Sequence, residues 1–250
     1  MIGSVHERAN IKRTDFTLFK SGSRFTDDTV MTLAVADCLM NRRPYAATLR
    51  EYGRRYPDRG YGGMFKKWLA SDDMGAYQSF GNGSAMRVSP VGFAMPSEQE
   101  VLGEAKRSAE VTHDHPEGIK GAQALAMAVF LAHHGADKPT IRKEISGRFK
   151  YDLDRTVERI RPKYKFDVSC QGSVPEAIIA FLDSSDVESA IRLAVSLGGD
   201  ADTLACMAGA VAQAFYKRVP REIVDEVSRR LAPELLQLTQ EFCRRHDVRV

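Results

Sequence analysis

Hydrophobic positions recur every three to four residues along most of the chain, which is the spacing of one face of an α-helix. The helices this pattern predicts cover 29–40, 117–134, a segment starting near Pro175, a segment from Asp186 closed by Gly198-Gly199, 200–218, 220–231 and 233–246. Pro116 and Gly135 stand just before and just after the second of these, where proline and glycine usually bound a helix. The chain therefore reads as helical almost throughout.

Alternating patterns typical of β-strands are nearly absent. The segment 162–169 (PKYKFDVS) is the best strand candidate, and its pattern is weak. Two glycine-rich segments, 59–63 (RGYGG) and 80–84 (FGNGS), interrupt the helical pattern, so we expect loops there whose backbone can approach a ligand closely. The sequence predicts an all-α protein of about ten helices in one compact domain covering 1–250, with no internal linker.

Composition and charge narrow the class of protein. The 250 residues are 43% hydrophobic and 28% charged, which is ordinary for a globular protein, and the net charge is only +3. Dense basic patches that would indicate nucleic-acid binding on charge alone are missing. The locally basic stretch 42–60 fits a solvated helix face better than a phosphate-binding surface.

The cysteines and the hydropathy pattern indicate a cellular compartment. Cys38, Cys170, Cys206 and Cys243 are far apart without a CxxC pair, which argues against zinc, and Cys38 and Cys206 lie in apolar helical patterns typical of buried free thiols. No signal peptide is visible, and no apolar run reaches the roughly 18 residues of a membrane span. We expect a reduced, soluble, cytoplasmic protein.

Carboxylates and hydroxyls gather at the predicted starts of two helices that are far apart in the chain. The two groups are Thr26, Asp27 and Asp28, and Asp200, Asp202 and Thr203. Taken singly, each group is explained by helix N-capping. If the fold brings both together, four carboxylates need a counter-charge, and an all-oxygen set prefers Mg²⁺, Mn²⁺ or Ca²⁺ over Zn²⁺. Two such ions could hold a vicinal diol and activate a water.

Five motifs occur together in a recognisable order: FTDDT at 25–29, FGNGSAMRVSP at 80–90, THDHPEGIKGA at 112–122, VPEAIIAFL at 174–182 and SLGGDADTLACMAGAVAQAFY at 196–216. Together they resemble the ADP-ribosylglycohydrolase family, which includes dinitrogenase reductase-activating glycohydrolase (DraG) and the eukaryotic ADP-ribosyl-acceptor hydrolases. Any one motif is weak evidence, but FTDDT followed later in the chain by GGDADT is a specific combination. The resemblance spans residues 3 to 216 and implies an all-helical orthogonal fold.

The resemblance also implies a set of site residues. A binuclear Mg²⁺ or Mn²⁺ centre would be held by Thr26, Asp27, Asp28, Asp200, Asp202 and Thr203. GSVHE at 3–7 resembles the end of the family's first motif, which makes Glu7 the acidic residue of a mobile flap, and Glu7 or Asp28 would transfer protons. The residues matching the ADP-ribose pocket are Gly60, Ser79, Phe80, Gly81, Gly83 and His113, with Gly81 and Gly83 supporting a diphosphate-binding loop.

The sequence departs from the family pattern at its start. Only Met1 and Ile2 precede Gly3, so we expect an N-terminus truncated relative to the family and a loosely anchored flap around Glu7. Phe80 stands where some members have tyrosine, which removes one hydroxyl.

The function that the resemblance implies is metal-dependent hydrolysis of the C1″ glycosidic bond of the distal ribose, which releases ADP-ribose from a modified protein side chain or another conjugate. ADP-ribosylated nucleic acid stays open as a substrate, a membrane partner is not expected, and a monomer is the default. The alternative is a non-catalytic ADP-ribose-binding protein of the same fold. A phosphatase of the DxD kind is disfavoured, because DADT opens a helix in an all-α chain.

Overall fold

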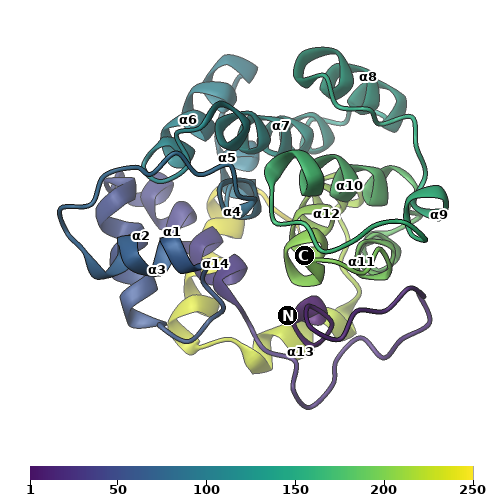
Figure 1. Cartoon of the computed structure of the whole chain (residues 1–250), viewed down its shortest axis with the longest axis horizontal. Coiled ribbons are helices and arrows are strands. Elements are labelled where there is room, and N and C mark those ends of the chain that lie inside the picture. The colour runs from purple at the N-terminus through teal and green to yellow at the C-terminus, as the bar shows by residue number, and fades with distance from the viewer. Residues whose placement is uncertain (250) are drawn as a thin grey trace.

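The regular structure of the chain is helical throughout the part that the computed structural model describes, residues 1–249 (Figure 1). Its elements are η1 (Ile2–Val5), α1 (Asp27–Asn41), α2 (Tyr45–Arg55), α3 (Gly63–Ala70), α4 (Gly83–Met86), α5 (Ser89–Ala94), α6 (Glu98–Glu110), α7 (Pro116–His133), α8 (Lys138–Phe149), α9 (Val157–Ile160), α10 (Cys170–Leu182), α11 (Val187–Ser196), α12 (Ala201–Tyr216), α13 (Arg221–Arg230) and α14 (Pro233–Arg245). The predicted all-α fold is confirmed.

One detail of the predicted elements is wrong. Helix α10 begins at Cys170 rather than near Pro175, because the Ser169 hydroxyl accepts the Gly172 N–H at 3.1 Å and caps the helix earlier. Pro175 then lies inside the helix, where it lacks one backbone N–H. The segment 162–169 is no strand, and within residues 1–249 it makes only an isolated bridge between Gly81 and Ser169.

Short helices make the chain richer in elements than the predicted ten or so. Helices α4 and α9 have four residues each, and α3 and α5 are little longer. Gly63 and Gly83 are the first residues of α3 and α4, so the two predicted glycine-rich loops end where these helices begin. Such helices are too short to show a hydrophobic period in the sequence.

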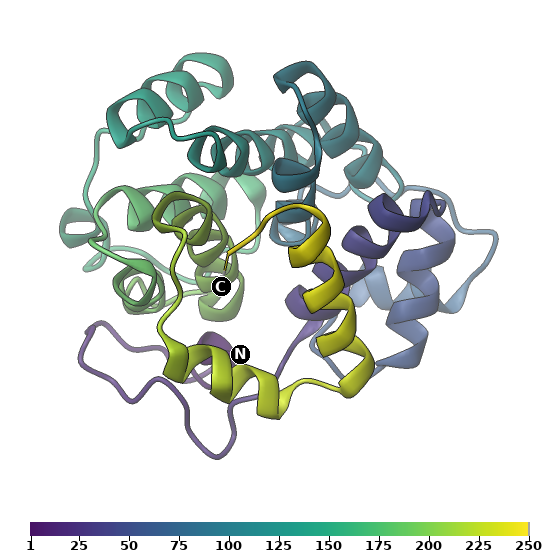
Figure 2. The ribbon, with the colours of Figure 1, turned by 180° about the vertical axis from the view of Figure 1, so that it is seen from behind.

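Helices α7 and α12 form the centre of the core. Helix α7 packs against α4, α5, α6, α8, α10 and α12, and α12 also contacts α1, α10, α11 and η1. Both central helices are rich in buried alanine, which permits close packing of several neighbours. Helix α13 lies at the edge of the molecule beside the N-terminus, and α14 packs against α1 (Figure 2).

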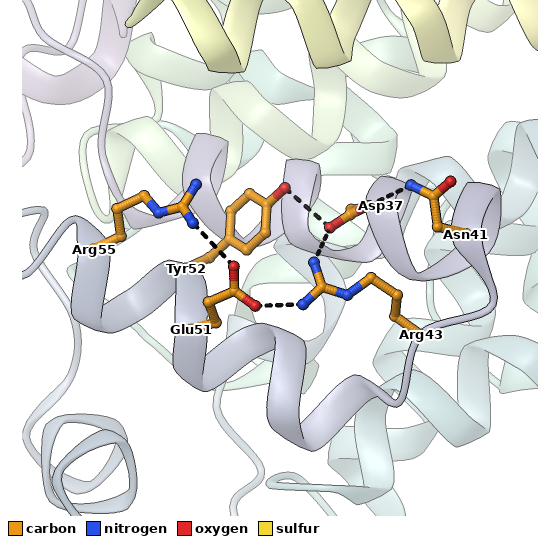
Figure 3. A network of polar contacts seen from close by, with 6 residues as sticks. All are labelled: Asp37, Asn41, Arg43, Glu51, Tyr52 and Arg55. Carbon is orange, nitrogen blue, oxygen red and sulfur yellow. Dashed lines mark hydrogen bonds and ion pairs between the residues drawn. The ribbon is translucent and has the colours of Figure 1, made fainter.

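A polar network fixes α2 on α1 (Figure 3). The buried Asp37 carboxylate of α1 accepts hydrogen bonds from Arg43 Nη1 at 2.5 Å, Asn41 Nδ2 at 2.6 Å and Tyr52 Oη at 3.1 Å. Arg43 also pairs with Glu51 of α2. A buried carboxylate with this many donors is fully satisfied, so the network holds α1 in one orientation.

The remaining sequence expectations concern thiols and membranes. Cys38 and Cys170 are buried free thiols, whereas Cys206 and Cys243 are half-buried, and the Cys206 thiol donates to the Met86 carbonyl at 3.5 Å. No helix within residues 1–249 is both long and apolar enough to cross a membrane.

Candidate active site

Helices α1 and α12 both begin at the same place in the core, next to α4. Asp27 and Asp28 are the first residues of α1, and Asp202 and Thr203 lie in the first turn of α12. Thr26 and Asp200 occupy the two N-cap positions, yet neither side chain makes a capping hydrogen bond. Six other helices do have such caps, from Ser97, His115, Asp137, Thr156, Ser169 and Asp186. Capping therefore does not explain the two acidic groups.

One pocket of about 390 Å³ opens over these helix starts. All of the sequence-predicted site residues line it except Thr26, Asp28 and Phe80. Asp27, Asp200, Asp202 and Thr203 form one part of its wall, and the residues of the glycine-rich segments and His113 form another. Residues that are far apart in the sequence, from Glu7 to Thr203, thus line a single cavity.

The three other predicted residues lie beside the pocket. Asp28 is almost fully buried beneath it, with its Oδ2 accepting the Thr26 hydroxyl at 2.7 Å. Asp28 and Asp202 also line a second, largely apolar cavity, together with Met1 and Ile2. The Phe80 ring is half exposed and packs edge-on against His115, with 5.4 Å between ring centroids.

The acidic groups are electrostatically strained. Burial, and after it the neighbouring carboxylates, raise the pKa of Asp27 to about 9 and that of Asp28 to about 7. The pKa of Asp200 is also raised well above its ordinary value, by burial and then by Asp202 and Asp28. Four carboxylates this close cannot all be ionised cheaply without positive charge.

The donor set fits a hard divalent cation. Asp28 Oδ1 and Asp202 Oδ1 are buried without a hydrogen-bond partner among residues 1–249, and each such orphaned oxygen costs about 1–3 kcal/mol. Carboxylate and hydroxyl oxygens are what Mg²⁺ and Mn²⁺ prefer. Within the same residues, no three acidic, histidine or cysteine side chains already stand in a ready metal-binding arrangement. The fit therefore rests on the orphaned oxygens and the shared charge.

Asn82 is the clearest site residue that the sequence prediction missed. Its buried side-chain amide donates to Asp200 Oδ2 at 2.8 Å and to Ser173 Oγ at 3.2 Å. It thereby orients one carboxylate of the acidic group from the glycine-rich segment. Its place inside FGNGS was visible, but no pattern distinguished it from a turn asparagine. The pocket also includes Met64, Phe65, Tyr77, Arg87, Phe166 and Val168, which the prediction did not contain.

The segment 79–83 forms a tight, well-held loop. The Gly81 N–H is donated to Ser79 Oγ at 3.2 Å, and the Asn82 N–H to the Val168 carbonyl at 2.7 Å. The Cys170 N–H is donated back to the Phe80 carbonyl at 2.8 Å. These bonds fasten the loop to the start of α10, so its glycines present backbone to the pocket at a fixed position.

Gly60 brings a second loop against the acidic group. Its φ of +102° favours glycine, and a Cβ built there would lie 3.2 Å from Asp27 Oδ1. The Asp27 N–H is donated to the Arg59 carbonyl at 2.8 Å, which ties the loop to α1.

Glu7 lines the pocket. Element η1 packs against the start of α12, and the following segment is tied down by Lys12 and by Arg192. Arg192 Nη1 donates to the Thr14 carbonyl at 2.9 Å and to the Phe16 carbonyl at 2.6 Å. The segment around Glu7 is therefore held by more contacts than its position in the sequence led us to expect.

Comparison with known proteins finds relatives that align with most of the chain. The chain is 30% identical over 256 residues to "ADP-ribosylhydrolase ARH3" of Mus musculus, covering 77% of this chain and 69% of that protein. It is 28% identical over 247 residues to "ADP-ribosylarginine hydrolase Tri1" of Pseudomonas putida (strain GB-1), covering 86% of this chain and 67% of that protein.

A solved structure and a family model point the same way. A chain of an "ADP-ribosylglycohydrolase-related protein complex" superposes with a TM-score of 0.70 and 27% sequence identity, covering 95% of this chain and 87% of that one. The family model described as ADP-ribosylglycohydrolase matches residues 3–249. The chain therefore belongs to the ADP-ribosylglycohydrolase family.

Proposed function

We propose that the protein is a metal-dependent hydrolase that removes ADP-ribose from a modified acceptor by cleaving the C1″ glycosidic bond of the distal ribose. The observation that carries this proposal is the meeting of two uncapped acidic helix starts in one pocket with a glycine loop. The names of the relatives, one of them an ADP-ribosylarginine hydrolase, support the same reaction class. An ADP-ribosylated protein side chain is the proposed substrate, and ADP-ribose the product.

The proposed cofactor is a pair of Mg²⁺ or Mn²⁺ ions held by Thr26, Asp27, Asp28, Asp200, Asp202 and Thr203. When bound, the ions supply positive charge that can hold the ribose hydroxyls and lower the pKa of a water. The residues that support this assignment are the two with orphaned buried oxygens, Asp28 and Asp202. Asn82 holds Asp200 in place through its amide, so the chain orients part of this oxygen set without help from a ligand.

Substrate positioning and proton transfer are assigned to the protein's own groups. The loop 79–83 offers backbone to the diphosphate, and the pocket wall orients the distal ribose toward the carboxylates. Glu7 is the proposed proton-transfer group. It lines the pocket, its carboxyl makes no hydrogen bond within residues 1–249, and burial raises its pKa. A carboxyl of raised pKa suits proton donation to a leaving group. Asp28, buried below the pocket, is the second candidate.

The deciding experiment uses the double variant Asp200→Asn with Asp202→Asn. We expect release of ADP-ribose from ADP-ribosylated protein to fall by at least a hundredfold in Mg²⁺ or Mn²⁺, a loss typical of removing groups essential to a metal site. EDTA should have the same effect on the wild-type protein. Release at the wild-type rate by the double variant would contradict the metal-dependent mechanism.

A panel of defined substrates separates the acceptor classes and the non-catalytic alternative. Arginine-linked, serine-linked and nucleic-acid-linked ADP-ribose would each be assayed with and without EDTA. Turnover of one class identifies the acceptor. Binding of ADP-ribose without turnover of any would instead identify the protein as a non-catalytic ADP-ribose-binding member of the same fold.

A further inference from the structure

Arg87 is a buried cation at the wall of the pocket. It closes α4, is only 1% exposed, and lines the cavity. Its Nη2 donates to the Ser108 carbonyl at 2.7 Å and to Thr112 Oγ1 at 3.0 Å. Burial lowers the pKa of Arg87 to about 10, so the guanidinium still carries its charge at neutral pH. Because a guanidinium has only N–H donors, Thr112 Oγ1 must be the acceptor in this pair.

The hydrogen bond that Thr112 accepts from Arg87 determines how Thr112 can interact with His113. The threonine is fully buried, and its Oγ1 lies 2.7 Å from His113 Nδ1. The hydroxyl carries one hydrogen, and within the described chain His113 Nδ1 is the acceptor in reach for it. If Nδ1 carried a proton instead, the hydroxyl hydrogen would be buried without a partner, at a cost of about 1–3 kcal/mol. Full satisfaction therefore requires Thr112 to donate to a bare Nδ1.

His113 points its other nitrogen at the glycine loop. A Cβ built on Gly83 would lie 3.1 Å from His113 Nε2, and one built on Gly81 would lie 3.6 Å from it. His113 lines the pocket. Burial, reinforced by the charge of Arg87, lowers its pKa well below the ordinary value, so the ring is neutral and exists as a single tautomer or a mixture of two.

We propose that Arg87 and Thr112 are positioning residues that fix His113 as the tautomer protonated on Nε2, which presents a permanent N–H donor beside the glycine loop to an anionic oxygen of the bound ligand. This inference rests on the proposed function, which places a diphosphate at that loop. The opposite tautomer would turn a lone pair toward a phosphate oxygen and repel it. The hydrogen bonds from Arg87 to Thr112 and from Thr112 to His113 therefore leave a neutral N–H donor beside the loop. This donor does not require the imidazole ring to be positively charged.

The test combines a tautomer measurement with a binding measurement on matched variants. ¹⁵N chemical shifts of the His113 ring in the free protein report which nitrogen carries the proton, and calorimetry gives the affinity for ADP-ribose. Thr112→Val removes the hydroxyl at nearly constant shape, whereas Thr112→Ser keeps it. We expect wild type and T112S to show the Nε2–H form alone. For T112V we expect a mixture of tautomers and binding weakened by the reciprocal of the remaining Nε2–H fraction, about twofold for an even mixture, with T112S unchanged from wild type.

The outcomes separate this inference from the proposed function. A wild-type ring protonated on Nδ1 would overturn the inference, and so would a T112V ring that keeps the pure Nε2–H form with unchanged affinity. If T112V does not fold, the wild-type spectrum together with the behaviour of T112S still decides the tautomer. A wild-type protein that shows the Nε2–H form but does not bind ADP-ribose would instead contradict the proposed function.

Discussion

Gly83 stands where any side chain would touch the imidazole of His113. A Cβ there would lie 3.1 Å from His113 Nε2 and 3.3 Å from Cε1. We expect Gly83→Ala to displace the ring from the loop and weaken ADP-ribose binding by about tenfold, the equivalent of one misplaced hydrogen bond. Isothermal calorimetry measures the affinity, and thermal unfolding checks that the fold survives.

Gly103→Ala is the matched control for this change. Gly103 lies within α6, and a Cβ built there meets no atom within 4 Å. Alanine in an open helical position should leave binding unchanged and raise stability by about 0.5–1 kcal/mol. Equal affinity of the Gly83→Ala variant and wild type would show that the ring can yield without losing its role.

At single-residue resolution, the sequence singled out the carboxylates but not the groups that orient the side chains around them. Asp27, Asp200 and Asp202 stand out because clustered acids at helix starts have a chemical reason to be there. Asn82 and Arg87 do not stand out, because their roles depend on Asp200 and Thr112, which lie far away in sequence. Partners of this kind become visible only when the fold brings them together.

Lys12 links the segment after η1 to the loop that precedes Asp200. Its Nζ donates to the Tyr164 carbonyl at 2.7 Å and to the carbonyls of Leu197 and Gly198, just before Asp200. It thus fastens the segment that carries Glu7 to the loop between α11 and α12. We expect Lys12→Met to release this segment, with hydrogen–deuterium exchange in residues 8–20 about fivefold faster, as the loss of about 1 kcal/mol predicts.

Arg13→Met is the comparison for this variant. The Arg13 ion pair with Asp15 at 3.5 Å joins two side chains that are 69% and 80% exposed, and such pairs contribute little. Exchange in residues 8–20 should therefore match wild type. If Lys12→Met also matched it, the anchoring of the Glu7 segment would have to come from η1 and Arg192 alone.

The elements show where a hydrophobic pattern suffices and where it does not. Helices α7 and α12 were predictable because a long helix repeats its buried face several times. Pro175 misled the prediction of α10, because a proline usually marks a helix start and here Ser169 supplies an earlier cap. Short helices such as α4 and α9 owe their shape to the packing around them rather than to their own pattern.

Across the whole molecule, the buried acidic group opposes folding when no positive charge balances it. Asp202 contributes to the raised pKa values of Asp27, Asp28 and Asp200, which shows that its charge acts on all three neighbours. We expect Asp202→Asn to raise the free energy of unfolding in EDTA by about 1–2 kcal/mol, because it removes the carboxylate that disfavours the ionised forms of its three neighbours. Urea unfolding of both proteins in EDTA measures this difference.

Divalent ions should reverse the order of stability of wild type and the Asp202→Asn variant. A cation that binds only the folded state adds RT ln(1 + [L]/Kd), or about 2.7 kcal/mol at a hundredfold excess over Kd. Wild type should gain this stabilisation in Mg²⁺ or Mn²⁺, whereas Asp202→Asn should gain little. Asp15→Asn, which changes an exposed carboxylate that does not line the pocket, should respond as wild type does. Equal ion-dependent stabilisation of Asp202→Asn and wild type would mean that the ions bind away from α12, and that the acidic helix starts serve some purpose other than holding metal.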